Sequence, residues 1–149
     1  MTTRAAAPVP GSARRTTTSG RAALAALVVD IALVLVFAAV GRRSHGEADA
    51  LAGLAHTAWP FLAGLALGWL LVALRRWRPL AVVPAGLVVW AGALLGGHVL
   101  RVVSGQGSAA SFVVVSAVVL AVFLLGWRAL RTPLARLLRS GRASGYGHD

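Results

Sequence analysis

One acidic residue and two histidines lie inside long apolar stretches of this sequence, and theirs are the side chains that could carry chemistry. Asp30 is the single polar residue among residues 22–40, whereas His56 and His98 lie in the second and third apolar stretches. A carboxyl group within a membrane is costly to bury, so it commonly marks a polar contact between helices or a path for protons and cations. Two histidines on facing helices can ligate a haem or a metal ion.

Four apolar stretches must position these side chains, and each is long enough to cross a membrane. They are residues 22–40, 51–74, 80–100 and 111–130. A helix rises 1.5 Å per residue, so about 20 residues cross a hydrocarbon core of about 30 Å. The chain is 58% hydrophobic and 13% charged, whereas soluble domains carry about 25% charged residues. The sequence therefore predicts an all-α, polytopic membrane protein with four transmembrane helices.

The distribution of arginine predicts how these helices are oriented. All 15 basic residues are Arg, and the net charge is +11. Twelve lie in three segments that four spans would bring to one side: the N-terminal segment, the turn at residues 75–79 and the segment from Arg128 onward. The other side has Arg42, Arg43 and Arg101, together with His45. The positive-inside rule predicts that both termini are cytoplasmic in a bacterial plasma membrane, where the arginines meet anionic lipid head groups rather than nucleic acid.

The two ends of the chain differ from the transmembrane domain, residues 21–131. Residues 1–20 consist largely of Ala, Pro, Ser, Thr and Arg without an apolar period, which predicts a disordered basic tail. Thr132 and Pro133 suit the N-cap and the first position of a new helix. Because Leu134, Leu137 and Leu138 would share one face of it, residues 132–149 are predicted to form a short basic amphipathic helix and a flexible tail.

Two pairs of glycines indicate close packing between helices. Gly64 and Gly68 lie four residues apart in the second span, and Gly92 and Gly96 lie four residues apart in the third. Small residues at this spacing let two helix backbones approach each other in lipid. The partner face belongs either to another span of the same chain or to a second copy or another membrane protein, and the sequence leaves this open.

Asp30 has two alternative roles, one structural and one functional. Trp90 lies at a similar depth in the third span, and its indole N–H is a ready hydrogen-bond donor. A hydrogen bond between them would join the first and third spans. Alternatively, Asp30 is a carboxyl group that handles protons or cations. The sequence leaves both roles open.

The other polar residues within the spans are expected in the half of the membrane that faces outward. Pro60 has no N–H to donate to the carbonyl of His56, so the second span is expected to kink beside that imidazole. His98 and Ser116 lie at comparable depths, and the inner half is expected to hold essentially no acid or histidine. The predicted candidate site, opening outward, therefore consists of Asp30, His56, Trp90, His98 and Ser116.

A short motif recurs in the second and fourth spans. Leu67-Gly68-Trp69 reappears as Leu125-Gly126-Trp127, and both copies lie at the predicted cytoplasmic ends. This repetition is compatible with a duplicated helical hairpin, as in some transporters. Tryptophan and arginine at a membrane interface are equally well explained as anchors of the helix ends.

These residues lead to three functional hypotheses. The first is an integral membrane protein with a structural or accessory role. The second is a small transporter or channel subunit that handles protons or a small solute through Asp30, His56 and His98. The third is a redox protein whose His56 and His98 bind haem. No Ser/His/Asp spacing is diagnostic of catalysis, and the sequence has no Cys. We therefore expect no enzyme activity, no metal centre and no bound cofactor.

Four elements together resemble a known family. They are Asp30, Gly-Arg-Arg-Ser-His at residues 41–45, Ala-Trp-Pro-Phe at residues 58–61 and Gly-Trp-Arg at residues 126–128. The sequence is similar across residues 22–131 to the domain of unknown function 3054 family, small membrane proteins of actinobacteria and some archaea. The resemblance implies a protein with four spans. The family has no assigned activity, so the resemblance transfers no catalytic residue.

Overall fold

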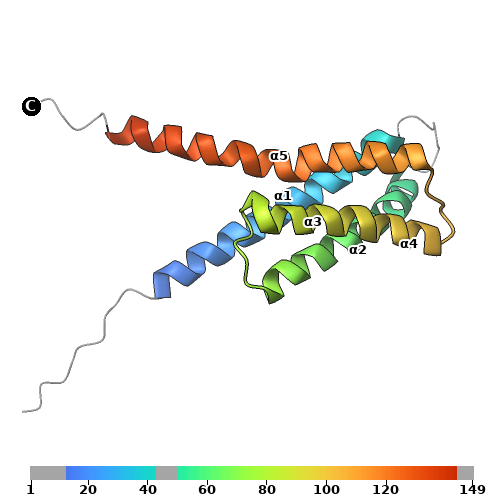
Figure 1. Cartoon of the computed structure of the whole chain (residues 1–149), viewed down its shortest axis with the longest axis horizontal. Coiled ribbons are helices and arrows are strands. Elements are labelled where there is room, and N and C mark those ends of the chain that lie inside the picture. The colour runs from blue at the N-terminus through green and yellow to red at the C-terminus, as the bar shows by residue number, and fades with distance from the viewer. Residues whose placement is uncertain (1–12, 43–49, 144–149) are drawn as a thin grey trace, which may run out of the picture.

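The computed structural model describes residues 13–42 and 50–143, and in these ranges the ordered elements are helical. The first two helices are α1 (Ala13–Arg42) and α2 (Ala50–Leu74). The third span combines η2 (Val82–Gly86), α3 (Leu87–Ala91), η3 (Gly92–Gly96) and α4 (Gly97–Val103), of which η2 and η3 are π-helical turns. The last helix is α5 (Ala110–Ala143) (Figure 1).

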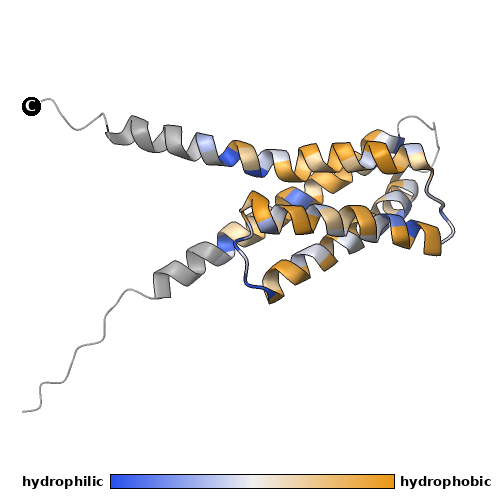
Figure 2. Cartoon of the chain, in the orientation of Figure 1, coloured by the Kyte–Doolittle hydropathy of each residue, from blue (hydrophilic) through white to orange (hydrophobic). Residues whose placement is uncertain are grey.

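Four helical segments in the described ranges are long and apolar enough to cross a membrane. They are Gly20–Arg42, Leu51–Leu74, Val82–Val103 and Ala110–Arg131. Figure 2 shows apolar residues along these segments, while hydrophilic residues gather near the turns that join them. Large side chains such as Leu67, Val99 and Val118 are exposed on the outside of the bundle, where lipid would solvate them. The prediction of an all-α fold with four spans is confirmed.

The third span begins irregularly because of a proline. Val83 is extended, with φ −121° and ψ 132°, although neighbouring residues are helical. The ring of Pro84 disfavours a helical conformation in the residue before it, so the regular helix can begin only at Pro84. The span was predicted to end near residue 100, whereas α4 continues to Val103. Gly105 and Gly107 follow with φ of 76° and 70°, a conformation that glycine adopts without strain.

Two predicted boundaries are wrong. α1 begins at Ala13, so residues 13–20 are helical rather than part of a disordered tail. α5 runs through Thr132 and Pro133 to Ala143, so no separate helix starts there. A proline inside a long helix removes one backbone donor, which bends a helix but does not necessarily end it. The predicted tails at residues 1–12 and 144–149, and the loop residues Arg43 and His45, lie outside the described residues.

The four glycines predicted to pack helices together contact one another within the chain. A Cβ atom on Gly64 would overlap the carbonyl oxygen of Gly92, and one on Gly92 would lie 2.8 Å from the carbonyl oxygen of Gly64. Gly96 packs on Gly64, and Gly68 packs on the backbone of Val88 and Val89. The partner of the second-span glycines is therefore the third span of the same molecule, so this face is not available to a second copy.

Candidate functional site

Asp30 forms a buried ion pair with an arginine of the last helix. Asp30 on α1 and Arg128 on α5 both have a relative side-chain exposure of 0%. The guanidinium donates in a two-pronged geometry, from Nη1 to Oδ1 at 2.8 Å and from Nη2 to Oδ2 at 2.7 Å. Such planar, two-bond pairs are among the strongest that arginine makes. Asp30 and Arg128 are 98 residues apart in the sequence, and their ion pair joins the first and fourth spans.

Two tryptophans complete the surroundings of the carboxylate. Trp69 on α2 donates its indole N–H to Oδ2 at 3.0 Å, and Trp127 on α5 donates to Oδ1 at 2.9 Å. Each carboxylate oxygen of Asp30 therefore accepts two hydrogen bonds, which uses the four acceptor positions of an ionised carboxyl group. The group is fully satisfied and has no acceptor position left for a substrate.

Arg128 extends this contact to the turn before the third span. Its Nη1 also donates to the carbonyl of Leu124 at 2.7 Å, and its Nε donates to the carbonyl of Pro79 at 3.3 Å. The guanidinium carbon lies 4.7 Å from the ring centre of Trp127, a cation–π distance. Asp30, Arg128 and their partners thus connect α1, α2 and α5 to the start of the third span. We call Asp30, Trp69, Trp127 and Arg128 the polar lock.

The polar lock corrects two predictions. Trp90 is not the partner of Asp30, because its indole donates to the carbonyl of Ala117 at 3.1 Å and so joins the third span to α5. Trp69 and Trp127 hold Asp30 rather than only anchoring helix ends. Arg128 lies near the end of an apolar run, a position that is typical of a topology signal and does not indicate a buried partner.

The sequence did contain a signal for this lock. The repeated Leu-Gly-Trp motif supplies both tryptophans that bind Asp30, and Arg128 directly follows the second copy. Both copies of the repeat carry an indole N–H donor, and the apolar spans contain one acid. This combination indicates that both indoles could donate hydrogen bonds to that acid.

Removing one indole donor tests the polar lock. We expect Trp69→Phe and Trp127→Phe each to lower the free energy of unfolding by about 1.5–3 kcal/mol, since each removes a hydrogen bond to a buried charge. Trp59→Phe is the matched control, because Trp59 is 40% exposed. SDS titration in mixed micelles, followed by far-UV circular dichroism, measures the effect. If all three variants lowered the free energy of unfolding equally, this role of the two indoles would be contradicted.

His98 and Ser116 are brought together as predicted, but in a separate place. The Nε2 atom of His98 lies 2.7 Å from the Ser116 hydroxyl, and its Nδ1 atom bonds the Ser108 hydroxyl. Ser116 itself donates to backbone carbonyls of α5, so it accepts from Nε2. A neutral imidazole then accepts from Ser108 at Nδ1. The histidine joins the end of the third span to α5 and packs against the rings of Phe61 and Phe112.

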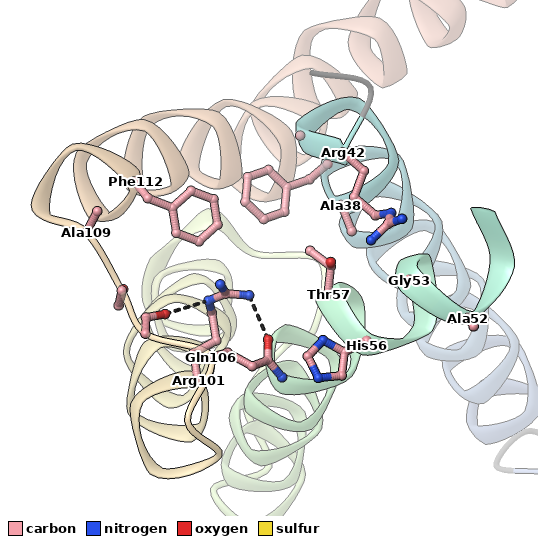
Figure 3. A pocket seen from close by; sticks show the side chains of 14 residues that line it. Ala38, Arg42, Ala52, Gly53, His56, Thr57, Arg101, Gln106, Ala109 and Phe112 are labelled. Atoms are coloured by element: carbon pink, nitrogen blue, oxygen red, sulfur yellow. Dashed lines mark hydrogen bonds between the residues drawn. The ribbon is translucent and has the colours of Figure 1, made fainter. Parts of the chain in front are cut away.

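A cavity of about 940 Å³, with several charged and polar side chains among its lining residues, lies at the end of the bundle where α1 ends and α5 begins. Figure 3 shows Arg42 from α1, His56 and Thr57 from α2, and Arg101 and Gln106 around this hollow. We call it the cationic cavity. The described residues that line it include no acid; they are Phe37, Ala38, Gly41, Arg42, Ala52, Gly53, His56, Thr57, Arg101, Gln106, Gly107, Ser108, Ala109 and Phe112.

Arg101 is held in place at this cavity by neutral groups. Its Nη1 donates to the side-chain oxygen of Gln106 at 2.8 Å, and its Nε donates to the carbonyl of Gly107 at 3.2 Å (Figure 3). The guanidinium carbon lies 5.1 Å from the ring centre of Phe112. These contacts orient the fork of donors but do not neutralise its charge. The amide nitrogen of Gln106 is buried without a hydrogen-bond partner among the described residues.

The single predicted site is therefore two separate places. His56, Arg42 and Arg101 line the cationic cavity, and His98 reaches its edge through Ser108. Asp30 lies in the polar lock, which shares no residue with the cavity lining. Pro60 lies inside a continuous α2 and is fully buried, and the kink predicted there stays a prediction.

Comparison with known proteins gives a family but no characterised relative. Neither the curated proteins nor the solved structures that were compared gave a match. The model of a family described as a protein of unknown function, DUF3054, matches residues 27–131. This range includes the polar lock, the four glycines and every described residue of the cationic cavity. Because the match spans more than half of the sequence, this chain belongs to the DUF3054 family.

Proposed function

We propose that this protein is a non-enzymatic accessory protein of the bacterial plasma membrane that binds an anionic group in the cationic cavity. Both termini are cytoplasmic in this proposal, so the cavity faces outward. The observation that carries the proposal is the guanidinium of Arg101, held by neutral groups at a cavity that Arg42 and His56 from two other spans also line. A cavity lined by cationic groups from several elements concentrates anions there.

The geometry of Arg101 supports binding of a phosphate or carboxylate group. A guanidinium offers five N–H donors in a planar fork that matches two oxygens of such an anion. Two of its nitrogens already bond neutral acceptors, which fixes the direction of the remaining donors. The hydroxyl of Thr57, which also lines this cavity, can donate a further hydrogen bond.

The polar lock supports an accessory role over proton transport. A carboxyl group that carries protons must release its partners at each cycle, whereas Asp30 is held by four hydrogen bonds and a buried counter-charge. The contacts of His98 likewise favour a structural role over haem ligation, because both of its ring nitrogens bond serine hydroxyls.

A binding measurement on the full-length protein tests this proposal. We expect sn-glycerol 3-phosphate to bind saturably to the detergent-solubilised protein in isothermal titration calorimetry. Arg101→Gln should weaken the affinity about tenfold, equivalent to ~1.4 kcal/mol, because it removes the charge that faces the anion. Arg131→Gln is the control, since Arg131 is exposed at the opposite end of α5's span.

Two results would contradict the proposal. One is the lack of saturable binding of the probe to the wild-type protein. The other is an affinity that Arg101→Gln and Arg131→Gln lower equally, which would indicate general attraction to a basic protein rather than binding in the cavity.

A further inference from the structure

An apolar groove runs along the side of the bundle between α1 and α5. Its volume is about 390 Å³. Its lining is apolar apart from Ser111 and consists of Phe37, Val40, Gly41, Ser111, Phe112, Val115, Val119 and Phe123. Val40 is 59% exposed and Val115 is 56% exposed, so the groove opens sideways, toward the lipid.

This groove lies next to the cationic cavity. Phe37, Gly41 and Phe112 line both spaces. Phe112 borders both spaces, and the guanidinium carbon of Arg101 lies 5.1 Å from the centre of its ring. A molecule placed across this boundary would meet cationic groups at one end and only apolar side chains at the other.

The length of the groove matches one leaflet of a bilayer. It extends along α5 from Ser111, in the first turn of the helix, to Phe123. These 12 steps correspond to about 18 Å at 1.5 Å per residue. Half of a hydrocarbon core is about 15 Å. An acyl chain that starts at the membrane surface would therefore reach the lower end of the groove near the bilayer centre.

We propose that the occupant of the two spaces is an anionic phospholipid, with its phosphate at Arg101 and one acyl chain in the groove. The inference rests on the proposed anion binding and adds the class of ligand. The acyl chain moves from the surrounding lipid into the groove, and both are apolar. The groove therefore favours a chain that fits its shape, without a gain in hydrophobic free energy. Discrimination between lipids comes from the head group, and an anionic lipid is retained over a zwitterionic one.

Lipid titration of the delipidated full-length protein, followed by native mass spectrometry, tests this inference. We expect dioleoyl phosphatidylglycerol to bind about tenfold more tightly than dioleoyl phosphatidylcholine. Val115→Trp fills the groove, so it should weaken phosphatidylglycerol binding about tenfold while sn-glycerol 3-phosphate still binds. Val122→Trp is the matched control, because Val122 lies on the same helix, is 62% exposed and does not line the groove.

The outcomes separate this inference from the proposed function. If sn-glycerol 3-phosphate binds but phosphatidylglycerol and phosphatidylcholine bind equally, or if Val115→Trp and Val122→Trp behave alike, the lipid inference is wrong and anion binding stands. If neither glycerol phosphate nor phosphatidylglycerol binds, both are wrong. A dimer that Val115→Trp dissociates would assign the groove to a second copy and would overturn the lipid inference.

Discussion

Arg128→Met is expected to lower the free energy of unfolding by about 3–5 kcal/mol, the largest effect of any single substitution proposed for this protein. Methionine has a long, flexible side chain that can replace the aliphatic part of arginine. The carboxylate of Asp30 stays buried without its counter-charge, and an uncompensated buried charge is strongly destabilising. The substitution also leaves the carbonyl of Pro79 without the hydrogen bond from Nε. Unfolding by SDS in mixed micelles, followed by far-UV circular dichroism, measures the loss.

Two further variants make this expectation specific to the ion pair. Arg131→Met removes an exposed arginine one turn along the same helix and should change stability by less than about 0.5 kcal/mol. Combining Asp30→Asn with Arg128→Met removes both charges, while the amide oxygen still accepts an indole N–H. The double variant should therefore be more stable than Arg128→Met alone. If Arg128→Met and Arg131→Met had the same free energy of unfolding, the polar lock would have no structural role.

Gly64→Ala is expected to lower the free energy of unfolding by about 1–3 kcal/mol, because it adds a methyl group where two backbones touch. The new Cβ atom would meet the carbonyl of Gly92 and the backbone nitrogen of Gly97, neither of which can turn away as a side chain can. The same SDS titration measures the change. We also expect Gly92→Ala to destabilise, since its Cβ would lie 2.9 Å from the Cα of Gly68.

A glycine in open space provides the control for this prediction. Gly126 is helical, and a Cβ atom built on it meets nothing within 4 Å. Gly126→Ala should therefore be neutral or stabilise α5 by up to about 1 kcal/mol, the difference in helix propensity. A Gly64→Ala variant as stable as Gly126→Ala would show that α2 and the third span are not in close contact.

The sequence predicted the parts of this molecule that depend on composition along the chain. Runs of about 20 apolar residues identified all four spans, because crossing the bilayer dictates length and polarity residue by residue. The four-residue spacing of Gly64 and Gly68, and of Gly92 and Gly96, identified the close contact for a similar reason. These signals are local and need no knowledge of which helices are neighbours.

The partner of Asp30 could not be found in the same way. Depth along each span suggested Trp90, but helix order around the bundle decides which side chains meet, and depth carries no information about it. Arg128 looks the same in the sequence whether it faces the aqueous boundary or the bundle interior. Of the residues that line the cationic cavity, the predicted site contained His56, whereas Arg42 and Arg101 were predicted as loop residues at the same end of the spans. The contribution of Gln106 required the fold of the turn before α5.

The sequence distance between the two charges of the polar lock has a consequence for synthesis of the protein. Asp30 and Arg128 are 98 residues apart, and at about 5–20 residues per second the ribosome needs roughly 5–20 s to make the chain between them. The first span leaves the ribosome within this interval, before the arginine that neutralises its carboxylate has been made. The nascent protein must therefore shelter Asp30 with water, with Trp69 or within the insertion machinery, and the bundle closes only when its last helix arrives.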